Sequence, residues 1–265
     1  MCGVQQFEGN ILEVCDFGQG RVLRVAADRV EAEPGQFAHL LCGEDSRRTL
    51  RRPFSIMDSS EGSLALLVKV VGEGTAWVAE RREGESLDML APLGKGFNLE
   101  MCERPLLVAG GTGLAPLYFL ARRLREKRGC NPRILWGLNC GEDFGKMPAW
   151  LDGKVEMSIA TCDGSAGMQG TALDLLERGL STGEYDGVYA CGPEAMLAAL
   201  GPLLQTYAVP CQVSVEQRMA CGIGACFGCA VRTSGEETSY MRACADGPVF
   251  DYGELAWNNH GPGSG

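Results

Sequence analysis

The sequence has few of the residues on which several common classes of protein depend. Its 265 residues include only two histidines, His39 and His260, and neither lies in a recognisable motif. Histidine is the side chain that most often acts as general acid or base near neutral pH. We therefore do not expect acid–base catalysis by histidine to be central to the function.

Positive charge is also scarce. The chain has 24 lysines and arginines against 34 aspartates and glutamates, which gives a formal net charge of −10. A protein that binds nucleic acid through its phosphates needs a basic surface. This balance argues against nucleic acid as a partner, and any anionic cofactor must be held by local features of the chain.

Long apolar runs are missing as well. No stretch approaches the roughly 18 residues that a membrane-spanning helix requires, and the mean hydropathy is −0.04. The first residues, MCGVQQFEGN, do not have the pattern of a signal peptide. We expect a soluble cytoplasmic protein, so the 13 cysteines do not indicate a secreted disulfide scaffold.

Four of the cysteines form a pattern near the end of the sequence. Cys221, Cys226 and Cys229 have the spacing C-x4-C-x2-C, and Cys244 follows after a predicted short hairpin. This is the spacing of plant-type iron–sulfur ligands. Zinc, which usually takes four cysteines from paired C-x2-C knuckles, and a disulfide are the alternatives. Three glycines could take positive φ and let the chain wrap closely round a [2Fe-2S] cluster: Gly222, Gly224 and Gly228.

The first hundred residues predict a small antiparallel barrel or sandwich. They show little helical periodicity and contain six short apolar or alternating runs, separated by turns rich in Gly, Pro, Asp or Ser. The runs are GNILEVCDF, RVLRVAA, QFAHLLC, RPFSIMD, SLALLVKVVG and SLDMLAPLG.

Two segments of this region are candidates for a cofactor site. In RRPFSI, Arg52 could bind a diphosphate through its guanidinium and Ser55 could reach a ring nitrogen. In VKVVGEGTAW, a strand runs into a glycine turn at 72–75 and a predicted helix, where an anion could bind. By themselves, such segments are more often an ordinary edge strand and a capped helix.

From Arg104 the pattern changes to alternating strands and helices, which predicts a doubly wound parallel sheet. The expected strands are LLVAG, RILWGLN, KVEMSIAT, DGVYACG and CQVSVEQ. The expected helices are LYFLARRLREKRG, TALDLLERGL and PEAMLAALGPLLQTY.

Turns that could hold a ligand follow two of these strands. GGTG at 110–113 comes between the first strand and a helix, and CGP at 191–193 ends a later strand. Both should line one crevice at the carboxyl edge of the sheet. GGTG lacks the full G-x-G-x-x-G fingerprint, so a simple tight turn is the alternative, and Cys191 could be only a small buried residue.

The order of RRPFS, VGEGT, PLGKGF, GGTGLAP and CGP resembles the ferredoxin-reductase superfamily, and the resemblance covers essentially the whole chain. Members of that superfamily join an FAD-binding barrel to an NAD(P)-binding α/β domain. RMACGIGACFGCAV and CADGPVF are similar to the electron-transfer subunits of NAD-dependent dihydroorotate dehydrogenases. In that family the C-terminal segment holds one [2Fe-2S] cluster, and a separate subunit with FMN oxidises dihydroorotate.

This resemblance implies a multi-domain β and α/β architecture. An antiparallel FAD-binding β-barrel would span 1–100, a Rossmann-like parallel α/β domain for NAD 101–215, and a small [2Fe-2S] domain 216–265. The protein would be an electron-transfer subunit of pyrimidine biosynthesis, in a heterotetramer with an FMN-containing dihydroorotate dehydrogenase catalytic subunit. The alternatives are a subunit of another NAD(P)H-dependent reductase, of the ferredoxin or sulfur-metabolism type, and a non-enzymatic redox or zinc-binding module.

Carried over residue by residue, the resemblance also assigns cofactor sites. The FAD residues would be Arg52, Pro53, Phe54, Ser55, Leu67, Val68, Lys69, Gly72, Gly74 and Thr75. The NAD diphosphate would meet Gly111, Thr112 and Gly113, and the nicotinamide would meet Gly192, Pro193 and the candidate catalytic residue Cys191. The cluster ligands would be Cys221, Cys226, Cys229 and Cys244. Phe54 replaces the tyrosine common in the superfamily, which removes a hydroxyl.

The implied cofactors divide the chemistry between them. NADH delivers two electrons as hydride and a [2Fe-2S] cluster accepts one, so a flavin between them is needed to split the pair. About fifty residues follow the sheet, too few for a further substrate domain, so the chain alone should not oxidise dihydroorotate. We expect NADH rather than NADPH, because LNCGED at 138–143 has two acids and no arginine.

Overall fold

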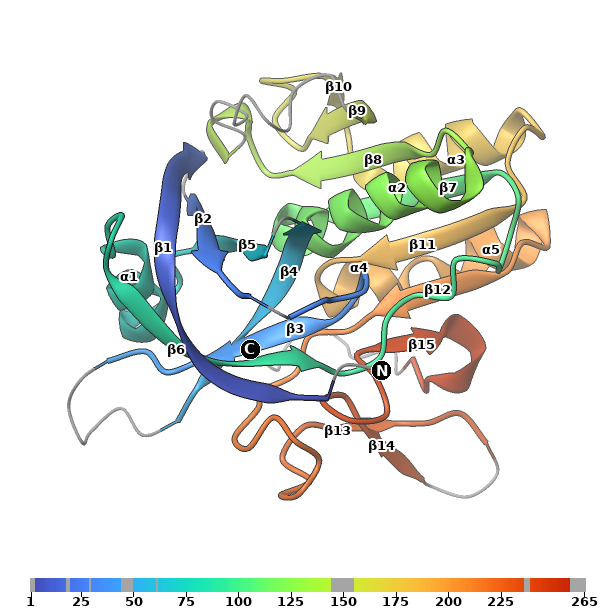
Figure 1. Cartoon of the computed structure of the whole chain (residues 1–265). Helices are drawn as coiled ribbons and strands as arrows, with labels where there is room; N and C mark the ends of the chain where they lie inside the picture. The colour runs from blue at the N-terminus through green and yellow to red at the C-terminus, as the bar shows by residue number, and fades with distance from the viewer. Residues whose placement is uncertain are drawn as a thin grey trace.

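A six-stranded barrel and a seven-stranded sheet lie side by side, with a two-stranded sheet below them in Figure 1. The computed structural model describes residues 3–17, 20–28, 30–43, 50–60, 62–143, 155–235 and 239–257. In these ranges no helix is long and apolar enough to cross a membrane.

The barrel closes in the order β1-β2-β5-β4-β3-β6, and all its neighbouring strands are antiparallel. Each of the six predicted runs forms one strand, which confirms a barrel rather than a sandwich. The strands are β1 (Gln5–Phe17), β2 (Gly20–Ala26), β3 (Phe37–Leu40), β4 (Arg52–Ser60), β5 (Ser63–Lys69) and β6 (Ser86–Leu93). Helix α1 (Glu73–Ala79) follows β5, as the glycine turn predicts.

Side chains on β3 alternate between the inside and the outside of the barrel. Ala38 and Leu40 pack in the barrel core, while Phe37 packs with residues of the sheet and of the C-terminal segment. The buried His39 lies on the same outer face as Phe37. One face of this strand is therefore covered by the rest of the chain.

The second sheet has the order β10-β9-β8-β7-β11-β12-β15 and is parallel except for β15. Leu107 and Ala109 on β7 pack toward helix α2, and Leu106 and Val108 pack toward helix α3 on the other face. Helices on both faces confirm the doubly wound arrangement. The strands are β7 (Pro105–Gly110), β8 (Arg133–Leu138), β9 (Glu156–Thr161), β10 (Met168–Gln169), β11 (Gly187–Cys191), β12 (Cys211–Ser214) and β15 (Val249–Asp251).

The predicted single helix over 193–207 is wrong, because the chain forms two helices there. They are α4 (Glu194–Ala198) and α5 (Gly201–Tyr207), separated by the two residues 199–200. Pro202 has no N–H to donate to the carbonyl of Ala198. The hydroxyl of Tyr252 donates to that carbonyl instead, at 3.1 Å. The other helices are α2 (Leu114–Arg128), α3 (Ala172–Ser181) and the 3₁₀ turns η1 (Gly111–Gly113), η2 (Gly141–Asp143) and η3 (Tyr252–Glu254).

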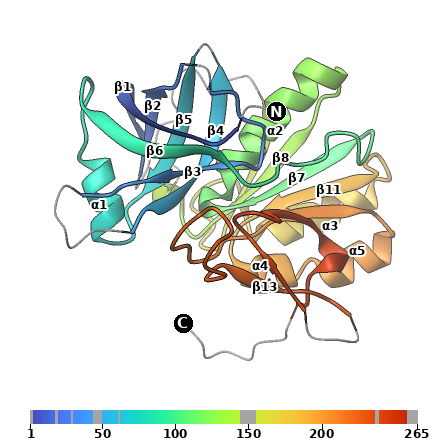
Figure 2. The ribbon, with the colours of Figure 1, turned by 60° about the horizontal axis from the view of Figure 1, so that its bottom comes forward.

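The sheet also does not end at β12 as predicted, because the chain returns to it after the cysteine-rich segment. Val213 of β12 pairs with Phe250 of β15 in antiparallel register. Between these strands, β13 (Ala230–Arg232) and β14 (Tyr240–Arg242) form the predicted short hairpin. Figure 2 shows this orange segment in front of the junction between the barrel and the sheet.

Helix α2 joins the two bodies. Its Phe119 is buried in the barrel core, and barrel residues Met57 and Leu67 belong to the core beneath the helix. The carboxylate of Asp58 on β4, whose side chain is 2% exposed, pairs with Arg122 of α2 and lies 3.6 Å from Arg24. The barrel and the sheet thus share one continuous interface.

We predict that Asp58→Asn destabilises the protein by about 3 kcal/mol, because it removes the buried charge that faces both Arg122 and Arg24 and leaves Arg122 with Glu126 as its ionic partner. Urea unfolding measures the change. Glu33→Gln is the matched control, since the Glu33–Lys127 pair at 3.2 Å is exposed and should contribute less than about 1 kcal/mol. Equal losses in the two variants would contradict the prediction.

Candidate functional site

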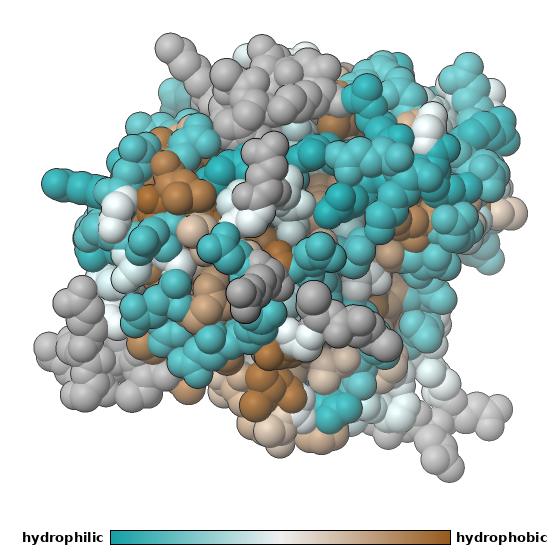
Figure 3. All heavy atoms as spheres, viewed as in Figure 1, coloured by the Kyte–Doolittle hydropathy of each residue, from teal (hydrophilic) through white to brown (hydrophobic). Residues whose placement is uncertain are grey.

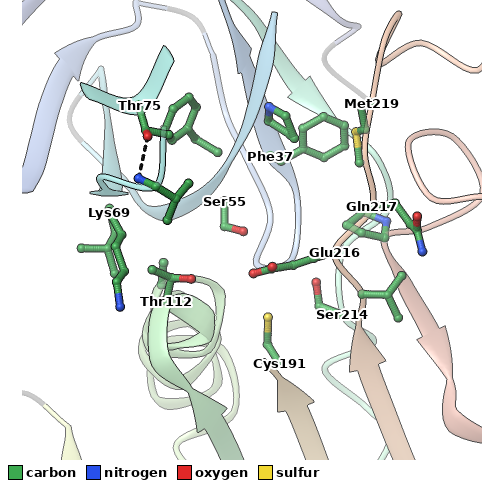
Figure 4. A pocket seen from close by; sticks show the side chains of 17 residues that line it. Phe37, Ser55, Lys69, Thr75, Thr112, Cys191, Ser214, Glu216, Gln217 and Met219 are labelled. Atoms are coloured by element: carbon green, nitrogen blue, oxygen red, sulfur yellow. Dashed lines mark hydrogen bonds between the residues drawn. The ribbon is translucent and has the colours of Figure 1, made fainter. Parts of the chain in front are cut away.

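A cavity of about 230 Å³, here the junction cavity, lies where the barrel, the sheet and the C-terminal segment meet (Figure 4). The barrel contributes side chains from β3, β4 and β5, and the sheet contributes the turn after β7 and the ends of β11 and β12. Its lining includes Phe37, Pro53, Phe54, Ser55, Leu67, Lys69, Thr75, Thr112, Cys191, Ser214, Glu216 and Met219.

The segment RPFS brings three of its four residues to this cavity. Pro53, Phe54 and Ser55 line it, while Arg52 does not. Arg52 lies beside the 72–75 turn instead, because a Cβ added to Gly74 would lie 3.6 Å from its Nε. Arg52 and the 72–75 turn, which were separate candidates for a diphosphate site in the sequence, therefore lie next to each other.

The hydroxyl of Thr75 holds the 72–75 turn in shape. Its Oγ1 accepts hydrogen bonds from the N–H groups of Val71 at 2.9 Å and Gly72 at 3.1 Å, and it donates to the carbonyl of Gly72. Figure 4 marks the first of these bonds. The threonine thus closes its own turn at the cavity wall.

Strand β5 turns its side chains alternately toward and away from the cavity. Leu67 and Lys69 line it, whereas Val68 is fully buried in the barrel core. Of these three predicted FAD residues, Val68 can offer only its backbone.

A second cavity of about 480 Å³, here the nucleotide cavity, lies at the carboxyl ends of β7, β8 and β11. The turns at 110–113 and 191–193 meet there, because a Cβ on Gly113 would lie 2.0 Å from the carbonyl oxygen of Cys191. A Cβ on Gly110 would lie 2.8 Å from Cδ of Pro193. Only glycine permits this contact between the backbones of neighbouring strands, at the point where the strand order reverses.

Cys191 is buried and lines the junction cavity. Burial raises the pKa of its thiol to about 12, and the nearby carboxylate of Glu216 acts in the same direction. The thiol is therefore neutral at physiological pH, which suits a packing surface rather than a nucleophile.

Glu216 and Lys69 line both cavities. Lys69 is the one basic side chain among the described residues that line either of them. Glu216, at the exit of β12, was not assigned a role from sequence; burial raises the pKa of its carboxyl. The signal for it in the sequence was a single acidic residue directly after an apolar strand. Figure 4 shows its carboxylate near Ser55, Ser214 and Cys191.

The structure brings the four predicted cluster cysteines into contact in pairs within the C-terminal segment. The sulfurs of Cys229 and Cys244, both buried, are 3.2 Å apart. Backbone N–H groups point at two of the sulfurs: Gly224 donates to Cys244 at 3.1 Å and Gly228 to Cys226 at 3.4 Å. Such donors stabilise thiolates and the sulfurs of iron–sulfur clusters.

The pKa values of two of these thiols are shifted in opposite directions. Burial opposes the charge on Cys221, yet the N–H groups of Ile223 and Cys226 outweigh it and lower its pKa to about 6. Burial and the adjacent Cys229 raise the pKa of Cys244 to about 12. In the described ranges no three Cys, His, Asp or Glu side chains surround a point for one metal ion, so the fit rests on these pairwise contacts.

The backbone of the loop departs from prediction at one position. Gly222 and Gly224 have φ of +71° and +83°, as expected, but the third residue with positive φ is Phe227, at +57°, and not Gly228. A Cβ on Gly228 would lie 3.5 Å from the sulfur of Cys226. The expectation for Gly228 is wrong because its N–H, rather than its φ, serves the loop.

Arg242 on β14 organises this loop and was not singled out from sequence. Its guanidinium donates to the carbonyl of Gly224 at 3.0 Å and to both carboxylate oxygens of Asp246, and it lies 5.1 Å from the ring of Phe227. These bonds from Arg242 lower the pKa of Asp246 to about 2. The cluster loop thus has a charged, planar support.

Residues 216–256 match a family model described as the iron–sulfur cluster binding domain of dihydroorotate dehydrogenase B. A dihydroorotate dehydrogenase B (NAD(+)) electron transfer subunit from Desulforamulus reducens is 39% identical over 236 residues, covering 85% of this chain and 87% of the relative. The subunit of the same name from Bacillus velezensis is 39% identical over 251 residues, covering 92% and 95%.

Solved structures resemble the whole fold. A chain from an NADH-dependent reduced ferredoxin-NADP oxidoreductase superposes with a TM-score of 0.83 at 29% identity, covering 94% of this chain and 90% of that one. The ferredoxin reductase of carbazole 1,9a-dioxygenase has a TM-score of 0.66 at 22% identity, covering 78% and 67%. The latter likeness concerns the fold alone.

We predict that Arg242→Lys releases iron about tenfold faster to a chelator, because lysine keeps the charge but cannot form the planar fork. The decay of visible iron–sulfur absorbance measures the rate. Arg232→Lys on the paired strand β13 is the matched control and should behave as wild type. Equal rates for Arg242→Lys and wild type would contradict the support role.

A second prediction concerns Glu216, whose pKa is raised by burial above its ordinary 4.5. The folded protein holds this proton more tightly than the unfolded chain, so stability falls as pH rises from about 4.5 through the folded pKa. Glu216→Gln should therefore have the higher Tm at pH 8, and the difference should shrink toward pH 4. Thermal scans test this, with the exposed Glu80→Gln as control; a pH-independent difference would refute it.

Proposed function

Because the chain belongs to the family of electron transfer subunits of dihydroorotate dehydrogenase B, we propose that it passes electrons between NADH, FAD and a [2Fe-2S] cluster. The cluster exchanges them with an FMN-containing dihydroorotate dehydrogenase catalytic subunit of pyrimidine biosynthesis. The two form a heterotetramer. The domain boundaries at residues 100 and 215 and the cytoplasmic location remain predictions.

One observation carries this proposal: the junction cavity touches all three parts of the chain. It shares Lys69, Thr112 and Glu216 with the nucleotide cavity, and it is lined by Met219, two residues before the first cluster cysteine. A flavin in the junction cavity would have a nicotinamide site on one side and the cluster loop on the other. This is the order that electron transfer from hydride to single electrons requires.

The residues assigned to FAD from the sequence remain the proposed FAD site. The guanidinium of Arg52 and the turn at 72–75 suit the diphosphate, and Phe54, Ser55 and Leu67 suit the ring system. When bound, FAD supplies the change from two-electron to one-electron chemistry. Phe54 and Leu67 are buried and keep water from the cavity wall, and Ser55 offers a hydroxyl there.

For NAD, we propose that the turns at 111–113 and 191–193 hold the diphosphate and the nicotinamide. The nucleotide cavity has the glycine-rich close approach that lets backbone N–H groups meet a phosphate. Lys69 provides the positive charge in this cavity, and the neutral thiol of Cys191 lines the adjoining junction cavity with Glu216.

The surface round the cluster suits a protein partner. Ile223, Phe227 and Tyr240 are more than half exposed, and Cys226 is exposed between the first two in sequence. Brown and tan spheres gather at the bottom of Figure 3, where Figure 1 shows the cluster loop. An apolar rim round the electron outlet is expected where another subunit docks.

A second candidate function has one specific observation in its favour. The likeness at 29% identity and a TM-score of 0.83 is to a chain of an NADH-dependent reduced ferredoxin-NADP oxidoreductase. The same three sites would then serve a different protein at the cluster surface. Co-purification of the stable partner distinguishes the two functions.

We predict that the isolated chain reduces artificial acceptors with NADH but does not couple dihydroorotate oxidation to NAD reduction. Coupled activity should appear when the FMN subunit is added, and NADH-dependent dye reduction by the isolated chain is the control. Full coupled activity from the isolated chain would contradict the proposal. No coupling after mixing, with dye reduction intact, would favour the second candidate.

We also predict a kcat/KM for NADH at least tenfold above that for NADPH. Asn139 and Asp143 line the nucleotide cavity at the end of β8, where a carboxylate repels a 2′-phosphate. Asp143→Asn should narrow the preference, with Asp163→Asn on the exposed loop after β9 as control. Comparable kcat/KM values for both nucleotides in the wild-type chain would refute the prediction.

A further inference from the structure

His39 has no part in the sites described so far, yet it lies between them. It is fully buried on the outer face of β3, opposite Pro53 of the RPFS segment on one side and Leu90 of β6 on the other. Its ring meets the ring of Phe37, which lines the junction cavity, edge-on at 6.4 Å. Strand β3 therefore carries both this imidazole and a side chain that lines the junction cavity.

On its other side the imidazole packs against the cluster loop. A Cβ added to Gly222 would lie 2.3 Å from Nδ1 of His39 and 2.9 Å from its Cε1. Gly222 has φ of +71° and directly follows the ligand Cys221. The backbone at the first cluster cysteine thus rests on the ring, and a side chain at Gly222 would push the loop away.

The described part of the chain offers the polar atoms of this ring no hydrogen-bond partner. Both ring nitrogens are buried, and neither has a hydrogen-bond partner among the described residues. Burial lowers the pKa of the imidazole to about 4, so the ring is neutral and carries one N–H; the backbone groups of Arg51 and Cys221 lie nearby without reaching hydrogen-bond geometry. A buried donor left unpaired is destabilising, so such a group points to a partner other than the described residues.

We propose that His39 is a positioning residue of the iron–sulfur centre, which holds the Cys221 end of the loop against strand β3 and donates its unpaired ring N–H to sulfur at that end. The inference rests on the proposed function. Donors to sulfur make an iron–sulfur cluster easier to reduce. The same side chain therefore links the position of the cluster to its potential.

A pair of variants of similar shape isolates the donor. His39→Gln keeps an N–H and His39→Met removes it, while Leu40→Val changes the same strand on its core-facing side. In redox titrations of the holoprotein, His39→Met should shift the electron partition between flavin and cluster about tenfold toward the flavin, which is 59 mV for a one-electron couple. His39→Gln and Leu40→Val should stay near wild type.

A measurement on the unaltered protein covers the case in which His39→Met does not fold. The chain has two histidines, and His260 lies outside the described residues. With ¹⁵N-histidine, pulsed EPR of the reduced cluster should detect an imidazole nitrogen, and the signal should persist in His260→Asn. Absence of the coupling, or an unchanged potential in His39→Met, would overturn the inference. If the wild type shows no cluster EPR signal at all, the proposed function fails instead.

Discussion

The packing of helix α2 against strand β4 is the contact on which both cavities depend. Asp58 of the barrel is buried against Arg122 of the helix, and Phe119 of the helix enters the barrel core. The same helix follows the GGTG turn, so the interface that fixes α2 also fixes Thr112 at the junction cavity. Because a shared core resists sliding, the distance between the flavin and nicotinamide sites is set by packing rather than by a hinge.

The C-terminal segment is held against the barrel by several close contacts. A Cβ on Gly94 of the barrel exit would lie 2.6 Å from Cδ of Pro248, and one on Gly35 would lie 2.6 Å from Cγ2 of Val249. The N–H of Lys95 donates to the carbonyl of Gly247 at 2.5 Å. These contacts, together with the seat of Gly222 on His39, hold the cluster loop against the barrel. The rate of electron transfer falls steeply with distance, so a fixed distance between the cluster loop and the barrel favours fast transfer.

Sequence reasoning succeeded where the signal was local. Each barrel strand corresponds to one apolar or alternating run of the sequence. The turn at 110–113 follows a strand, as its sequence pattern predicts. The break before Pro202 was visible in principle, but its compensation by Tyr252, fifty residues later, was not. Glu216, Arg242 and His39 acquire their roles only through tertiary packing, since none belongs to a spaced motif. The motifs named the chemistry, and the fold supplied the side chains that support it.

The return of the chain to the sheet as β15 makes residues 216–248 a closed circuit rather than a tail. Both ends of this circuit are anchored in neighbouring strands, β12 and β15, by ladder hydrogen bonds. A group that binds the circuit only in its folded form stabilises that edge of the sheet by mass action. Cluster insertion and the pairing of β15 with the sheet are therefore thermodynamically linked. Loss of the cluster would make this edge of the sheet more sensitive to proteolysis.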